Sequence, residues 1–118
     1  MEVSIETRTR DQAFIIEISG EVDLYSSPLV REKVLQTIQR QRPPLLLIEL
    51  SQVTYMDSSG IATLVEGLQL SKDTQTRFLL VGLSQAVLEV FQLVRLERVF
   101  EIYATEDDAL NEAQGEKP

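Results

Sequence analysis

Hydrophobic positions along the chain divide it into short strands that alternate with helices. Near the start, residues 3–9 and 13–19 read as two strands separated by the polar residues 10–12, which predicts a hairpin. The remaining expected strands are 45–50, 78–83 and 99–103. The first of these is apolar at five of its six positions, a pattern typical of a strand that is covered on both faces of a sheet.

The first helix is expected after the hairpin and has recognisable start and stop signals. We expect Ser27 as its N-cap and Pro28 as its first helical residue. The Pro43-Pro44 pair ends it, because neither residue donates a backbone N–H and both disfavour helical geometry before them. Its expected buried positions, which recur at helical spacing, are Val30, Val34 and Ile38.

Three further helices are expected, each after a strand. They begin at about Ser58, after the N-cap Ser84, and after Thr105, which forms a weak capping box with Asp108. The resulting order, β-β-α-β-α-β-α-β-α, predicts an α/β fold with a mixed central sheet of about four to five strands and helices packed on it.

The length and net charge of the chain limit the kinds of protein it can be. The 118 residues suit one domain, which we expect over 1–114 with a frayed end at 115–118. The net charge is −8, and the stretch 106–117 contributes −4 of it. We expect a terminal helix there, whose first residues are acidic and therefore interact favourably with the helix dipole. The acidic balance argues against nucleic acid as a partner. We expect neither a secretory signal nor membrane insertion, and the absence of cysteine fits a reducing compartment such as the cytoplasm.

The chain contains no histidine and no cysteine, which excludes several catalytic chemistries. A Ser-His-Asp triad, a Cys-His pair and a zinc site with imidazole or thiolate ligands all need groups that are missing here. The glycine patterns of nucleotide-binding enzymes are absent too. We therefore expect no enzymatic activity, no metal and no cofactor.

The segment that ends in Asp57-Ser58-Ser59-Gly60 is the densest group of small polar residues, and it lies between the central strand and the second helix. Asp and Ser are preferred N-caps because their side-chain oxygens accept the free N–H groups of the first turn, so capping alone is the more general interpretation. A helix N-terminus also favours an anion, and a phosphate on Ser58 would meet those N–H groups. The two interpretations are compatible, since a capping serine is well placed to carry phosphate.

An aspartyl phosphate on Asp57 is a further hypothesis, because this acid follows a central strand as it does in receiver domains. Receivers resemble a regular βα alternation with an acidic pair after the first strand and a lysine near the last. This chain instead opens with a hairpin and has no lysine near 99–103, which argues against that interpretation.

The stretch 46–51 together with 56–61 resembles the STAS domain of bacterial anti-sigma-factor antagonists. Two other segments agree: Gly20-Glu21-Val22-Asp23 resembles the Gly-Glu-hydrophobic-Asp segment before the family's first helix, and 81–100 resembles its strand-helix-strand ending. The resemblance covers residues 3–110.

The resemblance implies partner switching. In the family, the unphosphorylated antagonist binds an anti-sigma factor that is also a serine kinase, which frees the sigma factor. Phosphorylation of the serine after the motif aspartate, here Ser58, ends the binding, and a serine phosphatase of PP2C type restores it. The resemblance further implies that Asp57, Ser59, Gly60 and Asp23 support this switch loop.

The chain departs from the family pattern at two places. Ile61-Ala62 stands where many antagonists carry Leu-Gly, and Arg95 stands where many carry a glycine that favours a left-handed helix end. The same fold also occurs as an unphosphorylated scaffold and as the cytoplasmic subunit of lipid-transport ABC systems, which remains the alternative function. The oligomeric state stays open, with Leu88 and Leu93 on the third helix as a candidate contact patch.

Overall fold

A single five-stranded sheet forms the centre of the computed structural model, which describes residues 2–115. Its strands are β1 (Val3–Arg10), β2 (Ala13–Val22), β3 (Leu45–Met56), β4 (Arg77–Val81) and β5 (Glu101–Tyr103). They lie side by side in chain order, with β1 antiparallel to β2 and all other pairs parallel. The predicted mixed sheet and the opening hairpin are therefore confirmed.

Three helices connect the parallel strands and a fourth follows the last strand, in the order expected from the sequence. They are α1 (Ser27–Gln36), continued by the π-helical turn η1 (Thr37–Gln41), then α2 (Ser58–Asp73), α3 (Gln85–Leu93) and α4 (Glu106–Gly115). Of the expected frayed end 115–118, Gly115 is the last residue of α4, and residues 116–118 lie outside the described residues.

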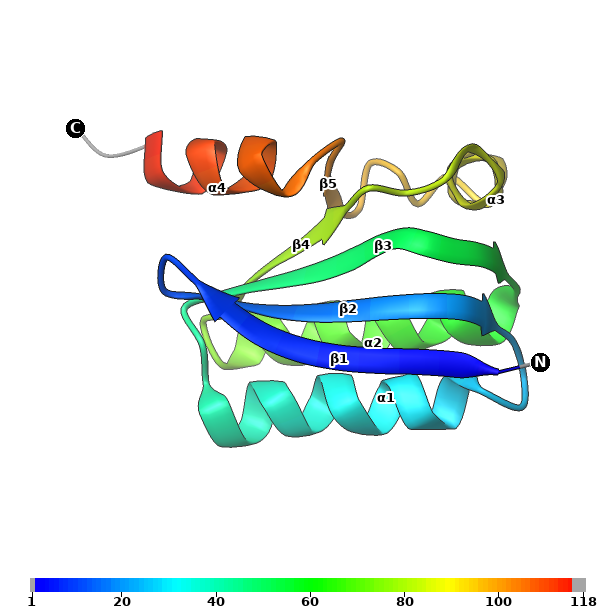
Figure 1. Cartoon of the computed structure of the whole chain (residues 1–118), viewed down its shortest axis with the longest axis horizontal. Helices are drawn as coiled ribbons and strands as arrows, with labels where there is room; N and C mark the ends of the chain where they lie inside the picture. The colour runs from blue at the N-terminus through cyan, green and yellow to red at the C-terminus, as the bar shows by residue number, and fades with distance from the viewer. Residues whose placement is uncertain (1, 116–118) are drawn as a thin grey trace.

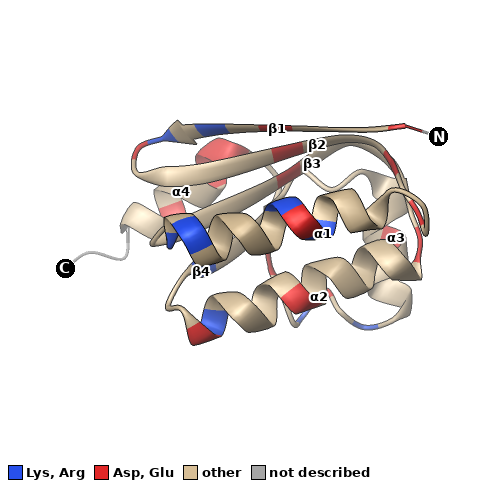
Figure 2. Ribbon diagram, turned by 90° about the horizontal axis from the view of Figure 1, so that it is seen from below, with Lys and Arg blue, Asp and Glu red and all other residues tan. Residues whose placement is uncertain are grey.

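The helices are distributed unequally over the two faces of the sheet. Figures 1 and 2 show α1 and α2 side by side on one face, where a Cβ added to Gly67 of α2 would lie 2.8 Å from Val34 of α1. The core on that side also contains Val87 and Phe91 of α3. On the other face, α4 covers a smaller core and contributes Ala109 and Leu110 to it. The three predicted buried residues of the first helix are all buried.

β3 is longer than the predicted strand 45–50, because its polar second half still pairs with β2 up to Val22↔Met56. β5 is shorter than the predicted 99–103, since Phe100 turns into the core and packs edge-on against Phe91, with ring centroids 5.6 Å apart. Hydrophobic runs thus marked where the strands lie, but not where their pairing ends.

The start of α1 corrects one sequence prediction. Ser26, not Ser27, is the N-cap, and Ser27 is already helical and buried. The Ser26 hydroxyl does not cap the helix, because it donates to the backbone oxygen of Glu21 at 2.7 Å and accepts from the N–H of Asp23 at 2.9 Å. The helix thus begins one residue earlier than predicted, and hydrogen bonds within the preceding loop occupy the hydroxyl of its N-cap residue.

The end of α3 shows how the fold accommodates Arg95 where many family members carry glycine. This residue adopts the left-handed conformation, with φ of 63°, although it is not a glycine. The N–H of the next residue, Leu96, donates to the oxygen of Phe91 at 2.8 Å, which is the pattern of a Schellman-type helix end. The cap expected of the family thus forms with arginine in the glycine position.

Candidate functional site

The candidate site lies where β2 and β3 end together. Their parallel pairing runs to Val22↔Met56, and the N–H of Asp57 donates to the oxygen of Val22 at 3.2 Å. A Cβ added to Gly60 would lie 2.6 Å from Met56 and 2.9 Å from Val22, closer than packed atoms tolerate. Glycine at this position therefore lets the first turn of α2 sit directly against both strand ends.

Asp57 is the N-cap of α2. It has an extended backbone, and its Oδ1 accepts from the N–H of Ser59 at 2.9 Å and more weakly from that of Gly60 at 3.4 Å. The Ser59 hydroxyl adds a bond of 2.5 Å to the same oxygen. The hydroxyl of Ser59, together with the two backbone N–H groups, holds the pKa of Asp57 below its usual range, while partial burial and the charge of Asp23 oppose this shift. The predicted capping role is confirmed for Asp57, whereas Ser58 is the first helical residue and does not cap α2.

The two serines of the motif differ in accessibility. Ser59 is half-buried, and its hydroxyl is committed to Asp57. Ser58 is exposed at the first helical position, and its hydroxyl makes no hydrogen bond to any other residue within 2–115. Only Ser58 thus presents a free hydroxyl to an incoming reagent.

Asp23 braces the neighbouring loop between β2 and α1. Its Oδ1 accepts from the backbone N–H groups of Tyr25 and Ser26, each at 3.0 Å. These bonds, that of the Ser26 N–H foremost, lower the pKa of the Asp23 carboxyl. Sequence reasoning placed Asp23 beside the motif but missed Ser26, whose role depends on the folded loop. The Asp23 and Ser26 side chains each accept the other's backbone N–H, as in a capping box, so their spacing of three residues could have indicated this role.

The two segments that form the site carry no basic side chain. Residues 20–30 and 51–62 contain no lysine or arginine, while they include Glu21, Asp23 and Asp57. Across the described residues, no cluster of three or more carboxylates, imidazoles or thiols has the arrangement of a metal site.

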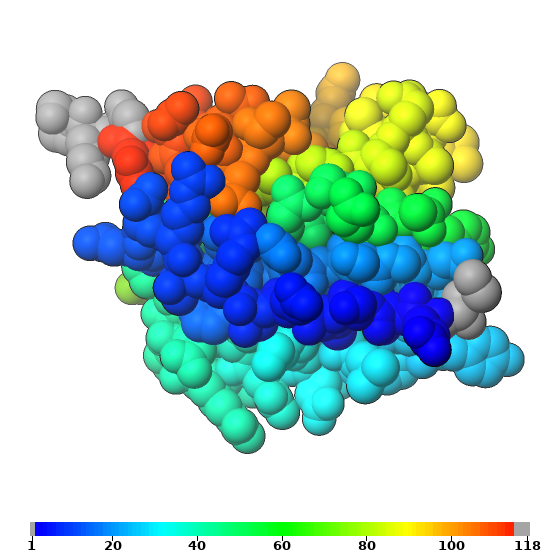
Figure 3. Space-filling model, viewed as in Figure 1, coloured from blue at the N-terminus to red at the C-terminus, as the bar shows by residue number. Residues whose placement is uncertain are grey.

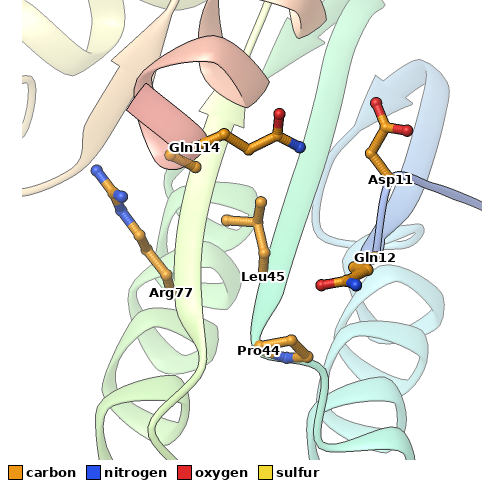
Figure 4. A pocket seen from close by; sticks show the side chains of 7 residues that line it. Asp11, Gln12, Pro44, Leu45, Arg77 and Gln114 are labelled. Carbon is orange, nitrogen blue, oxygen red and sulfur yellow. The ribbon is translucent and has the colours of Figure 1, made fainter. Parts of the chain in front are cut away.

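A hollow of about 550 Å³ lies at the opposite end of the sheet (Figure 4). It is lined by the hairpin turn Asp11-Gln12, by the beginnings of β3 and β4, and by the last turn of α4. The candidate residues at the end of β3 take no part in it, so this hollow adds nothing to the site. Within the described part of the chain, no helix is both long and apolar enough to cross a membrane.

Comparison with known proteins agrees with this fold. The STAS domain profile matches residues 4–109. An anti-sigma-B factor antagonist of Listeria monocytogenes is 34% identical over 92% of this chain and 95% of its own length, and one of Bacillus subtilis is 28% identical over 88% and 94%. The crystal structure of an anti-sigma factor antagonist from Mycobacterium paratuberculosis superposes with a TM-score of 0.86 at 27% identity, over 96% of this chain and 95% of the other.

The fold is thus that of a STAS domain. The chain belongs to the STAS-domain family of anti-sigma-factor antagonists.

Proposed function

We propose that this chain is an anti-sigma-factor antagonist that works by partner switching in the cytoplasm, with Ser58 as its phosphorylation site. Its unphosphorylated form binds an anti-sigma factor that is also a serine kinase, and the sigma factor is released. Phosphorylation of Ser58 ends the binding, and a serine phosphatase of PP2C type reverses it. The chain performs no catalysis of its own.

The observation that carries the proposal is the free hydroxyl of Ser58 at the start of α2. A kinase needs an acceptor that it can reach and reorient, and Ser59 offers neither because Asp57 holds its hydroxyl. The backbone N–H groups of the first turn favour an anion at this position, so phosphorylation need not unfold the helix.

The local charge explains how phosphate would act as a switch. A phosphate adds about −1.5 to −2 charge at neutral pH. Asp57 and Asp23 already place negative charge beside Ser58. The adjoining segments 20–30 and 51–62 supply no lysine or arginine to neutralise the charge of the phosphate. A binding surface centred on Ser58 would have to desolvate this dianion, which opposes association.

Asp57, Ser59, Gly60 and Asp23 support the switch in this proposal without accepting phosphate. Asp57 and Ser59 hold the first turn through their mutual hydrogen bond. Gly60 permits the close approach of that turn to β2 and β3, and Asp23 fixes the adjacent loop. We take 1–114 as the extent of the single STAS domain, of which the family profile matches residues 4–109.

The test is a binding and phosphorylation assay with the anti-sigma factor kinase of the native host. Ser58→Ala should bind with the affinity of the wild type and accept no phosphate, while Ser58→Asp should bind at least about tenfold more weakly. Ser59→Ala is the matched control and should still be phosphorylated. Phosphate incorporation into Ser58→Ala would move the site elsewhere, and co-purification of the wild type with a transporter ATPase in place of a kinase would support the alternative subunit function.

A further inference from the structure

One edge of the sheet is a long strand that has a neighbour on one side only. β1 is the outermost strand, and its 8 residues pair with β2 in an unbroken antiparallel register. It contains no proline and no bulge, two features that commonly protect a sheet edge from pairing. Figure 3 shows it in dark blue across the face turned to the viewer, with no other element over it. The outward backbone groups of β1 are therefore available to another strand.

The hairpin turn determines which backbone groups of β1 point outward. Only Asp11 and Gln12 separate the two strands, and both have positive φ. In such a two-residue turn, Arg10↔Ala13 is the closing hydrogen-bonded pair. Because hydrogen-bonded pairs alternate along an antiparallel ladder, the outward N–H and C=O groups belong to the odd-numbered residues of the range 3–9.

A groove of about 300 Å³ runs beside this edge, between β1 and α1. Its lining residues are Val3, Ile5, Leu29, Glu32, Lys33 and Gln36. Leu29 is 57% exposed although it is apolar. Glu32 and Lys33 are exposed too, and neither makes an ion pair or a side-chain hydrogen bond with another residue within 2–115. The groove thus combines apolar side chains with one unpaired charge of each sign.

We propose that β1 pairs with β1 of a second copy of this chain, in an antiparallel arrangement about a two-fold axis at Ile5. Ile5 then lies opposite Ile5 of the second copy, and Val3 lies opposite Thr7. A two-fold axis perpendicular to the sheet keeps both α1 helices on the same face, where they run in opposite directions. The two grooves join at the axis, and Glu32 of each copy faces Lys33 of the other.

Register and charge select this occupant. A pairing centred one residue further along would place Glu6 directly opposite Glu6, and like charges in that position are destabilising. Centring at Ile5 avoids this contact and brings the apolar part of the strand to the axis. Glu32 and Lys33 are adjacent and opposite in charge, so the groove is complementary to its own two-fold copy, whereas a partner carrying one sign of charge would leave one of them unpaired. The contact closes after two copies and leaves no free β1 edge.

Cysteine variants test the register directly, because the chain contains no cysteine of its own. In Ile5→Cys, the two thiols meet at the axis, where the Cα atoms of a hydrogen-bonded pair lie about 5.5 Å apart, a distance that a disulfide spans. Oxidation with copper phenanthroline should convert most of this variant into a covalent dimer. Thr9→Cys is the matched control, exposed on the same strand, and should not cross-link because the two copies of residue 9 lie more than about 20 Å apart. Stronger cross-linking in Thr9→Cys, or in Thr7→Cys, than in Ile5→Cys would overturn the proposed pairing.

Sedimentation of the charge variants tests the groove. Wild type at about 100 µM should sediment mainly as a dimer, and Lys33→Glu should weaken the dimer at least about tenfold, because carboxylates then meet on both sides of the axis. The double variant Glu32→Lys/Lys33→Glu exchanges the charges and should restore the dimer. Lys72→Glu in the last turn of α2 is the matched control, with the same change of charge away from the groove, and should leave the dimer unchanged.

Two results would overturn the inference: a wild type that stays monomeric at about 100 µM, or a double variant as weak as Lys33→Glu. β1 carries none of the residues assigned to the switch, so the inference goes beyond the proposed function and fails separately from it. A monomer that still binds and releases its partner would refute the dimer alone.

Discussion

Two helices of this fold begin in opposite electrostatic settings, although each starts with a short polar cap. Asp57 caps α2, and the Thr105 hydroxyl caps α4 by accepting the N–H of Asp108 at 3.0 Å. The first three positions of α4 carry the carboxylates Glu106, Asp107 and Asp108, whereas those of α2 carry two serines and a glycine. The dipole of α4 is therefore already compensated, and that of α2 has only its cap.

The carboxylates of α4 are neutralised by two arginines of the opening hairpin. Glu106, at the first helical position, accepts bonds from Arg8 at 2.5 and 3.1 Å and from Arg10 at 2.7 Å. Ser58 occupies the same helical position in α2, where the adjoining segments supply no cation. The carboxylate at the first position of α4 is thus neutralised and stabilises the fold. An anion at Ser58 would instead change the charge of the surface, as a reversible switch requires.

The largest stability effect is expected from the third helical position. Gly60→Ala should destabilise the protein by about 2 kcal/mol, because the added Cβ would lie 2.6 Å from Met56 and 2.9 Å from Val22. Asp108 is exposed at the corresponding position of α4, and Asp108→Ala should cost less than about 1 kcal/mol. Urea unfolding of the two variants measures the difference. Equal losses would mean that α2 approaches the strands no more tightly than α4 approaches its neighbours.

The element order and both caps could be predicted from sequence, because each depends on residues close together in the chain. Asp57 and Thr105 precede their helices directly, and their cap bonds span two or three residues. The position of Ser58 as the first residue of α2 follows from the same local pattern. The greater accessibility of the Ser58 hydroxyl over that of Ser59 could not be predicted, because it depends on which of the two hydroxyls binds Asp57.

Contacts between distant segments could not be predicted in this way. Arg8 and Glu106 are 98 residues apart, and their pairing arises because the hairpin extends beside the start of α4. The start of α1 was mispredicted for a local reason, since the helix begins one residue earlier than expected and the hydroxyl of its N-cap Ser26 binds the oxygen of Glu21, five residues before it.

Removing each cap is expected to have an intermediate effect. Asp57→Ala and Thr105→Ala should each cost about 1 kcal/mol, the usual contribution of an N-cap side chain. Asp57→Asn should retain most of the stability at neutral pH, because asparagine also caps well. Thermal unfolding at pH 7 measures these losses.

The two caps should differ in their response to acid. The folded-state pKa of Asp57 is lowered, so its contribution is complete above the ordinary aspartate pKa of about 3.9 and is lost as the pH falls through the lower folded value. Asp57→Asn should remove that part of the acid sensitivity, whereas Thr105→Ala should leave it unchanged. An acid transition in Asp57→Asn identical to that of the wild type would contradict this assignment.

The smallest effect is expected from the ion pairs of α4, which lie at the surface. The hydrogen bonds from Arg8, and then those from Arg10, hold the pKa of Glu106 below its usual range, so its stabilisation is complete above about pH 4.3 and is lost as the pH falls through the lower folded value. At neutral pH and low salt, Glu106→Gln should cost no more than about 1 kcal/mol, and about 0.5 M sodium chloride should remove most of the difference.

Hydrogen exchange locates that effect in the molecule. α4 buries only Ala109 and Leu110 within its described side chains, so losing its ionic anchor should speed amide exchange in α4 and leave α2 unchanged. Glu66→Gln is the matched control, because Glu66 pairs with Arg31 across α1 and α2, and it should not change exchange in α4. Faster exchange at the start of α2 in Glu106→Gln would show that the two helix starts are coupled, and the anion at Ser58 would then act on more than its own surface.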